Sequence, residues 1–398
     1  MINRFKKKAL TLWQIPKSAR IPKRVEYLIY DNEGADKICS CLVKSESVDI
    51  IHIRNEEISI ACLLLIPIMM RYEQVGKTRF TTLAFNAYID GWIHLCKPSV
   101  IITFIDNDPR FYTIKSRWEH FGVKTIAIQN GVRSFYLIKN SFTSFTKANH
   151  AIHLSCDLIA VLNSKASNMY KHFIKTDFFM HGSLINNSTL SHVATSERGA
   201  HILFISQFRR SLAESPLFDY ERKLLPTLKE WCVINNYGLS ILGCANEKEL
   251  VISENNFYRT ILGNNTYKFT KKADNFIEQY QSLDKASIVV SIDSTLGLEA
   301  IARGCKTAFF YGKTSSKNTL RESSEELNFL NSVGIAFDLD QASKQFIKTQ
   351  LDTLKMQSSK EWTSRVASCA SEVMYTDYKS ERLFEKIKRL MAPSKGNQ

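Results

Sequence analysis

The chain has 398 residues, of which 44% are hydrophobic and 23% charged, a composition that excludes disordered, collagenous and membrane-embedded proteins. A single core rarely serves so long a chain, so two domains of roughly 150–200 residues each are expected. The formal net charge of +14 favours an acidic partner or a solvated basic segment.

The N-terminal segment, residues 1–24, holds eight basic residues and no acidic one, interleaved with Leu10, Leu12, Trp13 and Ile15. It can dock on an anionic membrane surface or form a solvated tail, and both interpretations stay open. Nucleic acid is not an expected partner, because no nucleic-acid-binding motif accompanies the charge. The sequence shows no signal peptide, and the apolar run Ile58–Met70 is shorter than the about 20 residues that span a membrane. We therefore expect a cytoplasmic protein, peripheral on the inner membrane.

Nine cysteines occur without a Cys-x-x-Cys pair, and the nine histidines do not cluster with them at the spacing of metal ligands. This pattern is typical of reduced thiols inside a cell. Neither a metal site nor a bound cofactor is predicted.

Short apolar runs alternate with longer helical stretches from residue 25 onward, which is the pattern of parallel α/β layers. The predicted strands of the first half are Val25–Tyr30, Val48–Ile53, Val100–Ile105, Thr125–Ile128, Leu158–Leu162 and Phe178–Met180. The predicted helices include Ile58–Tyr72, Thr81–Leu95 and Phe111–Phe121. Residues 25–185 are expected to form a first domain, and the polar stretch 186–200 is expected to be a linker.

The alternation restarts over residues 201–375, which are expected to form a second domain. Its predicted strands are His201–Ile205, Leu239–Leu242, Tyr267–Phe269, Ser287–Ile292 and Thr307–Phe310, with helices Tyr220–Asn236, Asp274–Leu283 and Leu296–Arg303. An amphipathic helix, Lys379–Leu390, lies within a C-terminal segment, residues 376–398, that can pack back on the first domain. The predicted fold class is α/β, with two Rossmann-like domains facing a central cleft. Ligands of such sheets bind beyond the carboxyl ends of the strands.

The strand Val100–Ile105 ends in Asp106-Asn107-Asp108-Pro109. Pro109 favours the first turn of a helix that Asp108 would cap, which leaves Asp106 at the strand tip without a local role. A carboxylate that faces the cleft can act as a general base or a nucleophile. Asp106, or as the second choice Asp108, is therefore the candidate catalytic carboxylate.

Polar residues also follow the next strands of the first half. Gln129, Asn130 and Arg133 come after Thr125–Ile128, although Asn-Gly is also a common tight turn. Arg133 is a candidate to offset the charge of a leaving group. His181 lies at the predicted hinge, where it is either an acid–base catalyst or a hydrogen-bonded structural histidine.

In the second half, the strand His201–Ile205 is followed by Ser206, Gln207 and Arg209. We expect these three residues to line the donor side of the cleft, where an arginine can neutralise a phosphate. A plain surface turn is the alternative.

The strand Ser287–Ile292 runs into Asp293-Ser294-Thr295 and then a helix, whose first turn presents backbone N–H groups to an anion such as phosphate. Glu299 lies one turn after Thr295 on the same helix face, so it can reach ribose hydroxyls beyond a phosphate held by Ser294 and Thr295. Gly297 lets a ligand or a neighbouring strand approach closely. In the alternative interpretation this is a capped core helix, with Glu299 facing solvent. Asp293 or Ser294 can cap the helix, and Asp293 is the expected cap.

The chain resembles bacterial surface-carbohydrate (capsule and O-antigen) biosynthesis glycosyltransferases of GT-B type in five segments, "TFIDNDPRFY", "IAIQNGVRSFY", "MHGSLINN", "ILFISQFR" and "VVSIDSTLGLEAIARGCKTAFF". More distantly it resembles transferases that use CMP-linked Kdo or nonulosonic acids. The resemblance covers roughly Ser99 to Lys313. It implies metal-independent transfer of a sugar from a nucleotide donor to a glycan or lipid-linked glycan. Ser294, Thr295 and Glu299 would hold the donor, and Asp106, Asp108, Gln129 and Arg133 would lie on the acceptor side.

One departure bears on the donor. Transferases of CMP-sugars commonly carry a His-Pro dipeptide at the donor phosphate, whereas this chain has no His-Pro and no histidine after His201. A CMP-linked sugar is favoured, and a UDP-sugar, a GDP-sugar or a CDP-alditol phosphate stays open. The alternatives to a glycosyltransferase are a CDP-alditol phosphotransferase of cell-surface polymer synthesis and a non-catalytic GT-B-like subunit of a glycan assembly complex.

Overall fold

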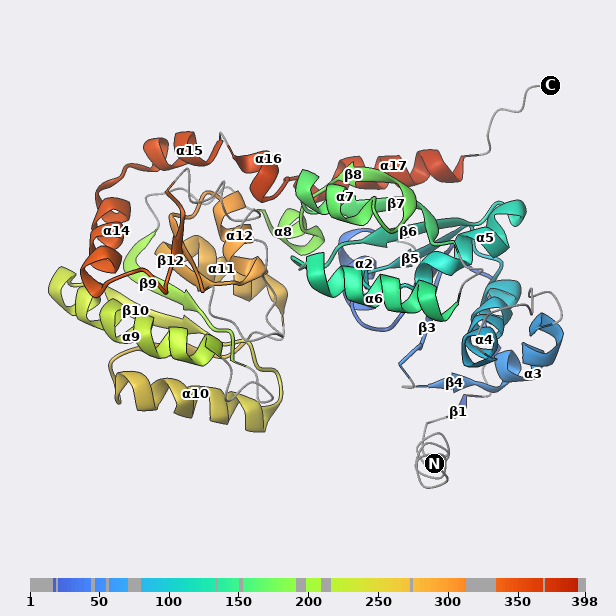
Figure 1. The fold of residues 1–398 in the computed structure, drawn as a ribbon, viewed down its shortest axis with the longest axis horizontal. Helices are drawn as coiled ribbons and strands as arrows, with labels where there is room; N and C mark the ends of the chain where they lie inside the picture. The colour runs from blue at the N-terminus through green and yellow to red at the C-terminus, as the bar shows by residue number, and fades with distance from the viewer. Residues whose placement is uncertain are drawn as a thin grey trace.

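The computed structural model describes residues 17–18, 21–43, 47–54, 57–70, 80–133, 135–149, 153–190, 198–208, 216–272, 275–312, 334–367 and 369–392. Within these ranges the chain forms two six-stranded sheets, each flanked by helices (Figure 1). Within the described residues, all strand pairs of both sheets are parallel. The predicted fold class, two Rossmann-like α/β domains, is confirmed.

The first sheet has the strand order β3-β2-β5-β6-β7-β8. Its strands are β2 (Tyr27–Tyr30), β3 (Val48–Ile51), β5 (Val100–Thr103), β6 (Lys124–Ile128), β7 (Ser155–Val161) and β8 (Lys175–Met180). The helices of this half are α2 (Ala35–Cys41), α3 (Ile60–Met69), α4 (Phe80–Cys96), α5 (Ile114–Trp118), α6 (Phe135–Ala148), α7 (Ser164–Tyr170) and α8 (Leu184–Thr189). Short 3-10 turns flank α5, at Phe111–Thr113 and Glu119–Phe121. Two further short strands, β1 (Lys17–Ser18) and β4 (Ile58–Ser59), pair with each other beside α3.

The second sheet has the strand order β11-β10-β9-β12-β13-β14. Its strands are β9 (Gly199–Ile205), β10 (Gly238–Leu242), β11 (Lys268–Thr270), β12 (Ala286–Ile292), β13 (Thr307–Tyr311) and β14 (Ala336–Asp338). The helices are α9 (Pro216–Asn235), α10 (Lys248–Leu262), α11 (Phe276–Lys285), α12 (Thr295–Ala302), α14 (Lys344–Met356), α15 (Ser359–Ala367), α16 (Ala370–Val373) and α17 (Glu381–Met391), with a 3-10 turn at Tyr378–Ser380. None of the helices in the described ranges is long and apolar enough to cross a membrane.

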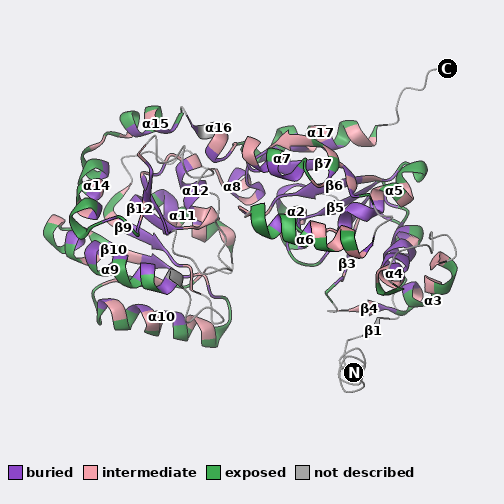
Figure 2. Ribbon diagram, in the orientation of Figure 1, coloured by how far each residue is buried: buried purple, intermediate pink, exposed green. Residues whose placement is uncertain are grey.

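Both sheets are buried on their two faces, which explains why their strands are continuously apolar. Alternate residues of one strand enter opposite cores: Leu28 of β2 packs in the cluster with α4, and Ile29 packs in the cluster with α2. Figure 2 shows the same division, with buried residues concentrated along the strands and exposed residues on the outer helices.

The chain passes between the two domains twice. It leaves the first domain through α8 and returns after α16, so that α17 lies along the first domain (Figure 1). Leu383 and Ile387 of α17 are buried in the same cluster as Tyr27, Ile29 and Ile38. The core of the first domain therefore includes side chains from the last helix of the chain.

Each predicted strand overlaps an observed one, whereas β1, β4 and β14 were not predicted. The prediction that a helix begins at Ile58 is wrong, because Ile58–Ser59 form β4. The predicted helix Phe111–Phe121 is divided into a 3-10 turn, α5 and a second 3-10 turn. The helices α2, α6, α7, α8 and α10 were also not predicted, and α8 extends into the stretch 186–200 that was expected to be a linker. Short β14 pairs only at the sheet edge with β13, where few residues are needed to complete the ladder.

Candidate functional site

The strand orders show a switch point in each sheet, and ligands of open parallel sheets ordinarily bind beyond the point where the order of strands reverses. In the second sheet the reversal lies between β9 and β12, whose carboxyl ends lead into Ser206 and Ser294. In the first sheet it lies between β2 and β5, which lead into Asp31 and Asp106. Predicted site residues of both domains thus follow the strands at these two switch points.

The turn between β12 and α12 is capped by Ser294. Its hydroxyl oxygen accepts a hydrogen bond from the Leu296 backbone N–H at 3.3 Å. Asp293 has a left-handed backbone with φ of 55°, which turns the chain from the strand into the helix. The prediction that Asp293 is the cap is therefore wrong. Ser294 fixes the position of the first turn of α12, the part of a helix that favours an anion.

The N-terminus of α12 contacts the first domain directly. The hydroxyl of Thr295 accepts a hydrogen bond from the Val132 backbone N–H at 3.0 Å, and Thr295 also lies close to Gly131. Arg133 is the next residue of that loop. The predicted donor end of α12 and the loop that follows β6 are therefore neighbours across the domain boundary.

Glu299 is buried, with only 6% of its surface exposed, so the alternative in which it faces solvent is excluded. Its carboxylate accepts a hydrogen bond from the Tyr280 hydroxyl at 2.7 Å. Burial raises the pKa of Glu299, and hydrogen bonds from Ser183 and Tyr280 partly oppose that rise. Since Ser183 caps α8, Glu299 lies where α12 meets the segment that joins the domains.

Gly297 is required by the packing of α12 on β12. A Cβ atom at this position would lie 2.5 Å from Oγ and 2.6 Å from Cβ of Ser291. Of the two predicted reasons for the glycine, close approach of a strand is the one that the structure shows.

Asp106 is completely buried at the end of β5 and has several partners. Its carboxylate accepts hydrogen bonds from Arg133 Nη2 at 3.0 Å, from the Asn130 N–H at 3.3 Å and from the Tyr170 hydroxyl. The Tyr112 hydroxyl donates to its backbone carbonyl at 2.6 Å. The prediction that Asp106 has no local role is wrong, because burial of a carboxylate demands partners and the chain supplies them. Its direct contact with Arg133 makes it a positioning residue for that guanidinium.

Asp108 does not cap a helix that begins at Pro109. Its carboxylate accepts a hydrogen bond from the Arg110 backbone N–H at 3.0 Å. It also forms an ion pair with the Arg110 guanidinium, whose Nη2 lies 2.7 Å from Asp108 Oδ2. The aspartate therefore closes a local turn, a common use of this side chain in loops. The first helical turn starts two residues after Pro109, at Phe111.

Gln129 and Asn130 hold the loop that carries Arg133. The buried Gln129 side chain donates to the Gly131 carbonyl at 2.9 Å and accepts from the Leu162 N–H at 2.9 Å. The Asn130 side-chain oxygen accepts from Arg133. Both residues thus fix the loop after β6. The Arg133 side chain is 24% exposed, and Asn130 is partly exposed as well.

His181 is a structural residue of the domain connection. It is completely buried; one ring nitrogen lies 3.1 Å from the Gly182 carbonyl and the other lies 3.0 Å from the Ser380 hydroxyl. Burial lowers the pKa of His181 to about 4, although the nearby Asp377 opposes the change. Of the two predicted roles, the geometry supports the hydrogen-bonded structural one and places the ring away from solvent.

Ser206 belongs to a buried polar cluster that was not predicted from the sequence. Its hydroxyl donates to Glu254 and accepts from the Tyr258 hydroxyl at 2.7 Å, while Tyr258 also lies within 3.1 Å of Glu221. The Glu221 carboxylate accepts a hydrogen bond from the Gln207 backbone N–H at 3.1 Å. The cluster fixes the loop after β9, and Arg209 lies outside the described residues. Glutamates in the helices α9 and α10 gave no sequence signal, because exposed helical glutamates are far more common.

Replacing Glu221 with glutamine is expected to stabilise the protein increasingly from pH 5 to pH 8. Burial raises the pKa of Glu221 to about 8, so the folded state keeps a proton that the unfolded state releases above its ordinary value of 4.5. The wild type therefore loses stability relative to E221Q across that window, by at most about 1.4 kcal/mol per pH unit. Urea unfolding at both pH values measures the difference. E230Q, on the exposed side of the same helix, is the control, and an equal effect of E221Q at both pH values contradicts the prediction.

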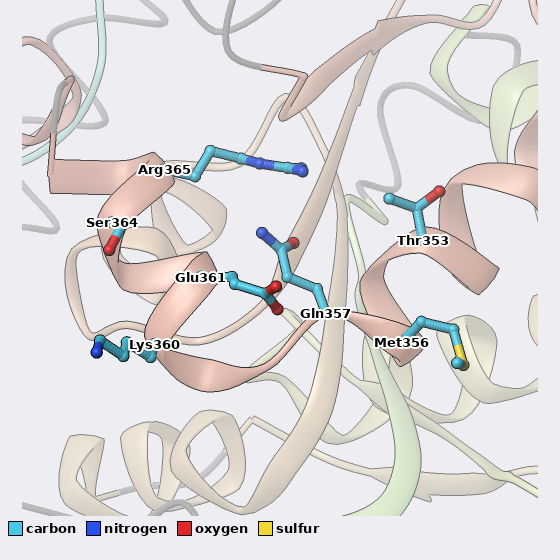
Figure 3. Close-up of a pocket in the computed structure, with 7 residues that line it drawn as sticks. All are labelled: Thr353, Met356, Gln357, Lys360, Glu361, Ser364 and Arg365. Atoms are coloured by element: carbon cyan, nitrogen blue, oxygen red, sulfur yellow. The ribbon is translucent and has the colours of Figure 1, made fainter.

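A shallow hollow elsewhere in the second domain is not part of this arrangement. It is lined only by α14, α15 and the turn between them, through Thr353, Met356, Gln357, Lys360, Glu361, Ser364 and Arg365 (Figure 3). None of these residues follows a strand end. Across the part of the chain that the structure describes, no group of three or more His, Cys, Asp or Glu side chains is placed to hold a metal ion.

Solved structures of the same architecture include a UDP-GlcNAc 2-epimerase, MnaA and a trehalose-6-phosphate synthase. UDP-GlcNAc 2-epimerase of Methanocaldococcus jannaschii, in complex with UDP-GlcNAc and UDP, is 11% identical, with 92% of this chain and 99% of that one covered and a TM-score of 0.52. MnaA of S. aureus with UDP is 12% identical over 94% and 99% of the two chains, with a TM-score of 0.50. Trehalose-6-phosphate synthase is 9% identical over 92% and 99%, with a TM-score of 0.50. At these identities the likeness establishes the fold, which is GT-B.

No curated protein matches the sequence. A family model described as "putative O-antigen biosynthesis protein" matches residues 126–391, which include the loop after β6, the domain connection and α12. Because the match spans more than half of the chain, the protein belongs to this O-antigen biosynthesis family.

Proposed function

We propose that this protein is a glycosyltransferase of surface-glycan synthesis, which moves a sugar from a nucleotide donor in the second domain to an acceptor in the first. The acceptor is a glycan, free or lipid-linked, and the enzyme works in the cytoplasm at the inner membrane. Membership of an O-antigen biosynthesis family and the GT-B fold support this proposal.

The observation that carries the proposal is the hydrogen bond between Val132 and Thr295. It brings two kinds of group together: the first turn of α12, which favours a phosphate, and the loop that presents Arg133. In glycosyl transfer an acceptor hydroxyl oxygen forms a bond to the anomeric carbon and releases its proton to the leaving phosphate or to solvent. The bond from that carbon to the donor phosphate oxygen breaks, and the phosphate keeps the electron pair. In the proposed reaction, Arg133 and the first turn of α12 offset that charge.

The remaining residues act around this point. Asp106 orients the Arg133 guanidinium through two hydrogen bonds, from Nη2 at 3.0 Å and from Nε at 3.3 Å. Ser294 and Thr295 hold the donor phosphate, and Glu299 accepts the ribose hydroxyls. A carboxylate has about four lone-pair positions, so the bond from Tyr280 leaves acceptor capacity on Glu299.

The donor nucleotide is proposed to carry a pyrimidine base. The resemblance to transferases of CMP-linked sugars favours CMP, and the chain lacks their His-Pro dipeptide. Structures of the same fold hold UDP or UDP-GlcNAc. The test measures the melting temperature of the protein with CMP, UDP or GDP added. We expect CMP or UDP to raise it, because a ligand that binds the folded state stabilises that state. The absence of a rise with all three would contradict it.

Replacing Glu299 with glutamine is expected to weaken nucleotide binding about tenfold or more, because a charged acceptor of the ribose hydroxyls is lost. Titration calorimetry with the bound nucleotide and its 2′-deoxy form isolates this contact. The wild type should prefer the ribose form by about tenfold, whereas E299Q should bind both forms equally. E278Q, on the neighbouring helix α11, is the control and should bind like the wild type. If E299Q still discriminates against the deoxy form, Glu299 does not bind the ribose.

The engagement of Asp106 in the buried contacts described above favours one other candidate, a non-catalytic subunit of a glycan assembly complex. The same variant separates the two functions in a complementation assay. If the protein is a transferase, cells that carry E299Q lose surface glycan in proportion to the loss of nucleotide affinity of the variant. Full glycan in cells whose E299Q protein no longer binds nucleotide supports the subunit.

A further inference from the structure

The helix α3 has a composition that is unusual for the surface of a soluble domain. Its ten residues, IACLLLIPIM, include no polar side chain. Surface helices ordinarily carry polar residues on their outward side, so that only an apolar stripe is buried. In α3 the outward side is apolar as well.

The apolar side chains of α3 are largely in contact with solvent. Cys62 is the only fully buried residue of the helix, whereas Leu64 is 73% exposed and Ile68 is 48% exposed. Ile60 and Leu63 are also exposed. We call Ile60, Leu63, Leu64 and Ile68 the α3 face. Contiguous exposed apolar side chains of this kind mark an interface with a protein or a membrane.

The position of basic residues distinguishes between these two partners. The strand β1 pairs with β4 through Lys17 opposite Ile58, and α3 begins directly after β4. Residues 1–24 include eight basic residues and no acidic one, and β1, which belongs to this segment, lies beside the start of α3. Lys23 and Arg24, which follow β1, are both exposed. An apolar face beside a segment whose charged residues are all basic is suited to the surface of an anionic bilayer. There the apolar groups enter the boundary of the acyl chains, and the basic groups contact the anionic headgroups.

We propose that the α3 face and the basic N-terminal segment dock the protein on an anionic lipid bilayer. The helix is too short to cross the membrane and lies in the interface. Figure 1 shows α3, β1 and β4 at the end of the first domain that is remote from the second domain. Docking there leaves the second domain clear of the bilayer. Each basic residue near the surface strengthens the association roughly fivefold.

Vesicle flotation of the full chain tests the proposal without nucleotide or acceptor, so its outcome is independent of the proposed function. The wild type should float with vesicles of phosphatidylcholine and phosphatidylglycerol, and much less with phosphatidylcholine alone or at high salt. L64Q/I68Q should reduce the partition coefficient about tenfold or more. Both positions are exposed, and an unchanged melting temperature shows that the variant folds.

The matched control is V233Q/I234Q, which removes two apolar side chains of similar exposure, 74% and 69%, from α9 of the second domain. This variant should float like the wild type. Flotation of L64Q/I68Q at the wild-type level overturns the proposal, as does failure of the wild type to bind anionic vesicles. Light scattering identifies the rival occupant: a wild-type dimer that L64Q/I68Q converts to a monomer, without vesicle binding, assigns the α3 face to a second copy of the chain.

Discussion

Replacing Asp106 with alanine is expected to lower the free energy of unfolding by about 3–5 kcal/mol. Asp106 is completely buried and receives hydrogen bonds from Arg133, Asn130 and Tyr170. Alanine leaves the guanidinium without its counter-charge and the Tyr170 hydroxyl without an acceptor, in a space that water fills poorly. Urea unfolding followed by circular dichroism measures the loss.

The control for this prediction is Asp219→Ala, which removes an ion pair with Arg222 on the surface of α9. Asp219 is 76% exposed, and an exposed pair contributes less than about 1 kcal/mol. A second variant, D106N/R133Q, removes both charges together and should recover part of the stability, because no buried charge is left alone. The opposite finding, a D106A protein as stable as the wild type but inactive, would return Asp106 to the role of catalytic carboxylate that the sequence predicts.

Gly182→Ala is expected to cost at least about 3 kcal/mol and to loosen the connection between the domains. Gly182 has a φ of 83°, where an alanine is strained by about 1–2 kcal/mol. The larger effect is steric, since the new Cβ would lie 1.8 Å from the Tyr375 carbonyl oxygen. Tyr375 belongs to the segment that returns to the first domain and donates to the Leu162 carbonyl at 2.9 Å. The chain must move apart at this crossing to accommodate a methyl group.

Gly122→Ala separates the steric effect from the backbone strain. Gly122 has a φ of 77°, and a Cβ there would meet no atom within 4 Å. This variant should therefore cost only about 1–2 kcal/mol. Thermal unfolding compares the two substitutions, and protease susceptibility at the returning segment reports the loosened crossing. Equal losses of stability in the two variants would show that the segment around Tyr375 moves aside without destabilising the protein, which would contradict the prediction.

The fold was predictable because its signals are local and repeated. Each strand of a doubly covered parallel sheet must be apolar on both faces, and this requirement marks runs such as Ile288–Ile292 in the sequence itself. The direction of a parallel strand then fixes which polar residues come at its carboxyl end. That reasoning correctly placed Ser206, Ser294, Asp106 and Gln129 after the carboxyl ends of their strands.

The partners of these residues were not predictable, because they come from distant parts of the chain. Asp106 pairs with Tyr170, 64 residues later, and His181 meets Ser380, 199 residues later. A strand-end position does not reveal whether a carboxylate faces the cleft or is enclosed by side chains from other elements. Glu254 shows the converse, since a glutamate in an amphipathic helix accepts the backbone N–H groups of Cys244 and Ala245 at 2.9 and 3.1 Å.

The return of α17 to the first domain has a consequence for how the protein is made. A ribosome releases the N-terminal domain first, and most such domains complete their folding before the next one appears. Here Leu383 and Ile387 are missing from the core around Ile29 and Ile38 until almost the whole chain has been synthesised. The domain that starts first is therefore finished last. Its unfilled core stays open to chaperones during translation, and a ribosome that stops before codon 383 leaves that core without the Leu383 and Ile387 side chains.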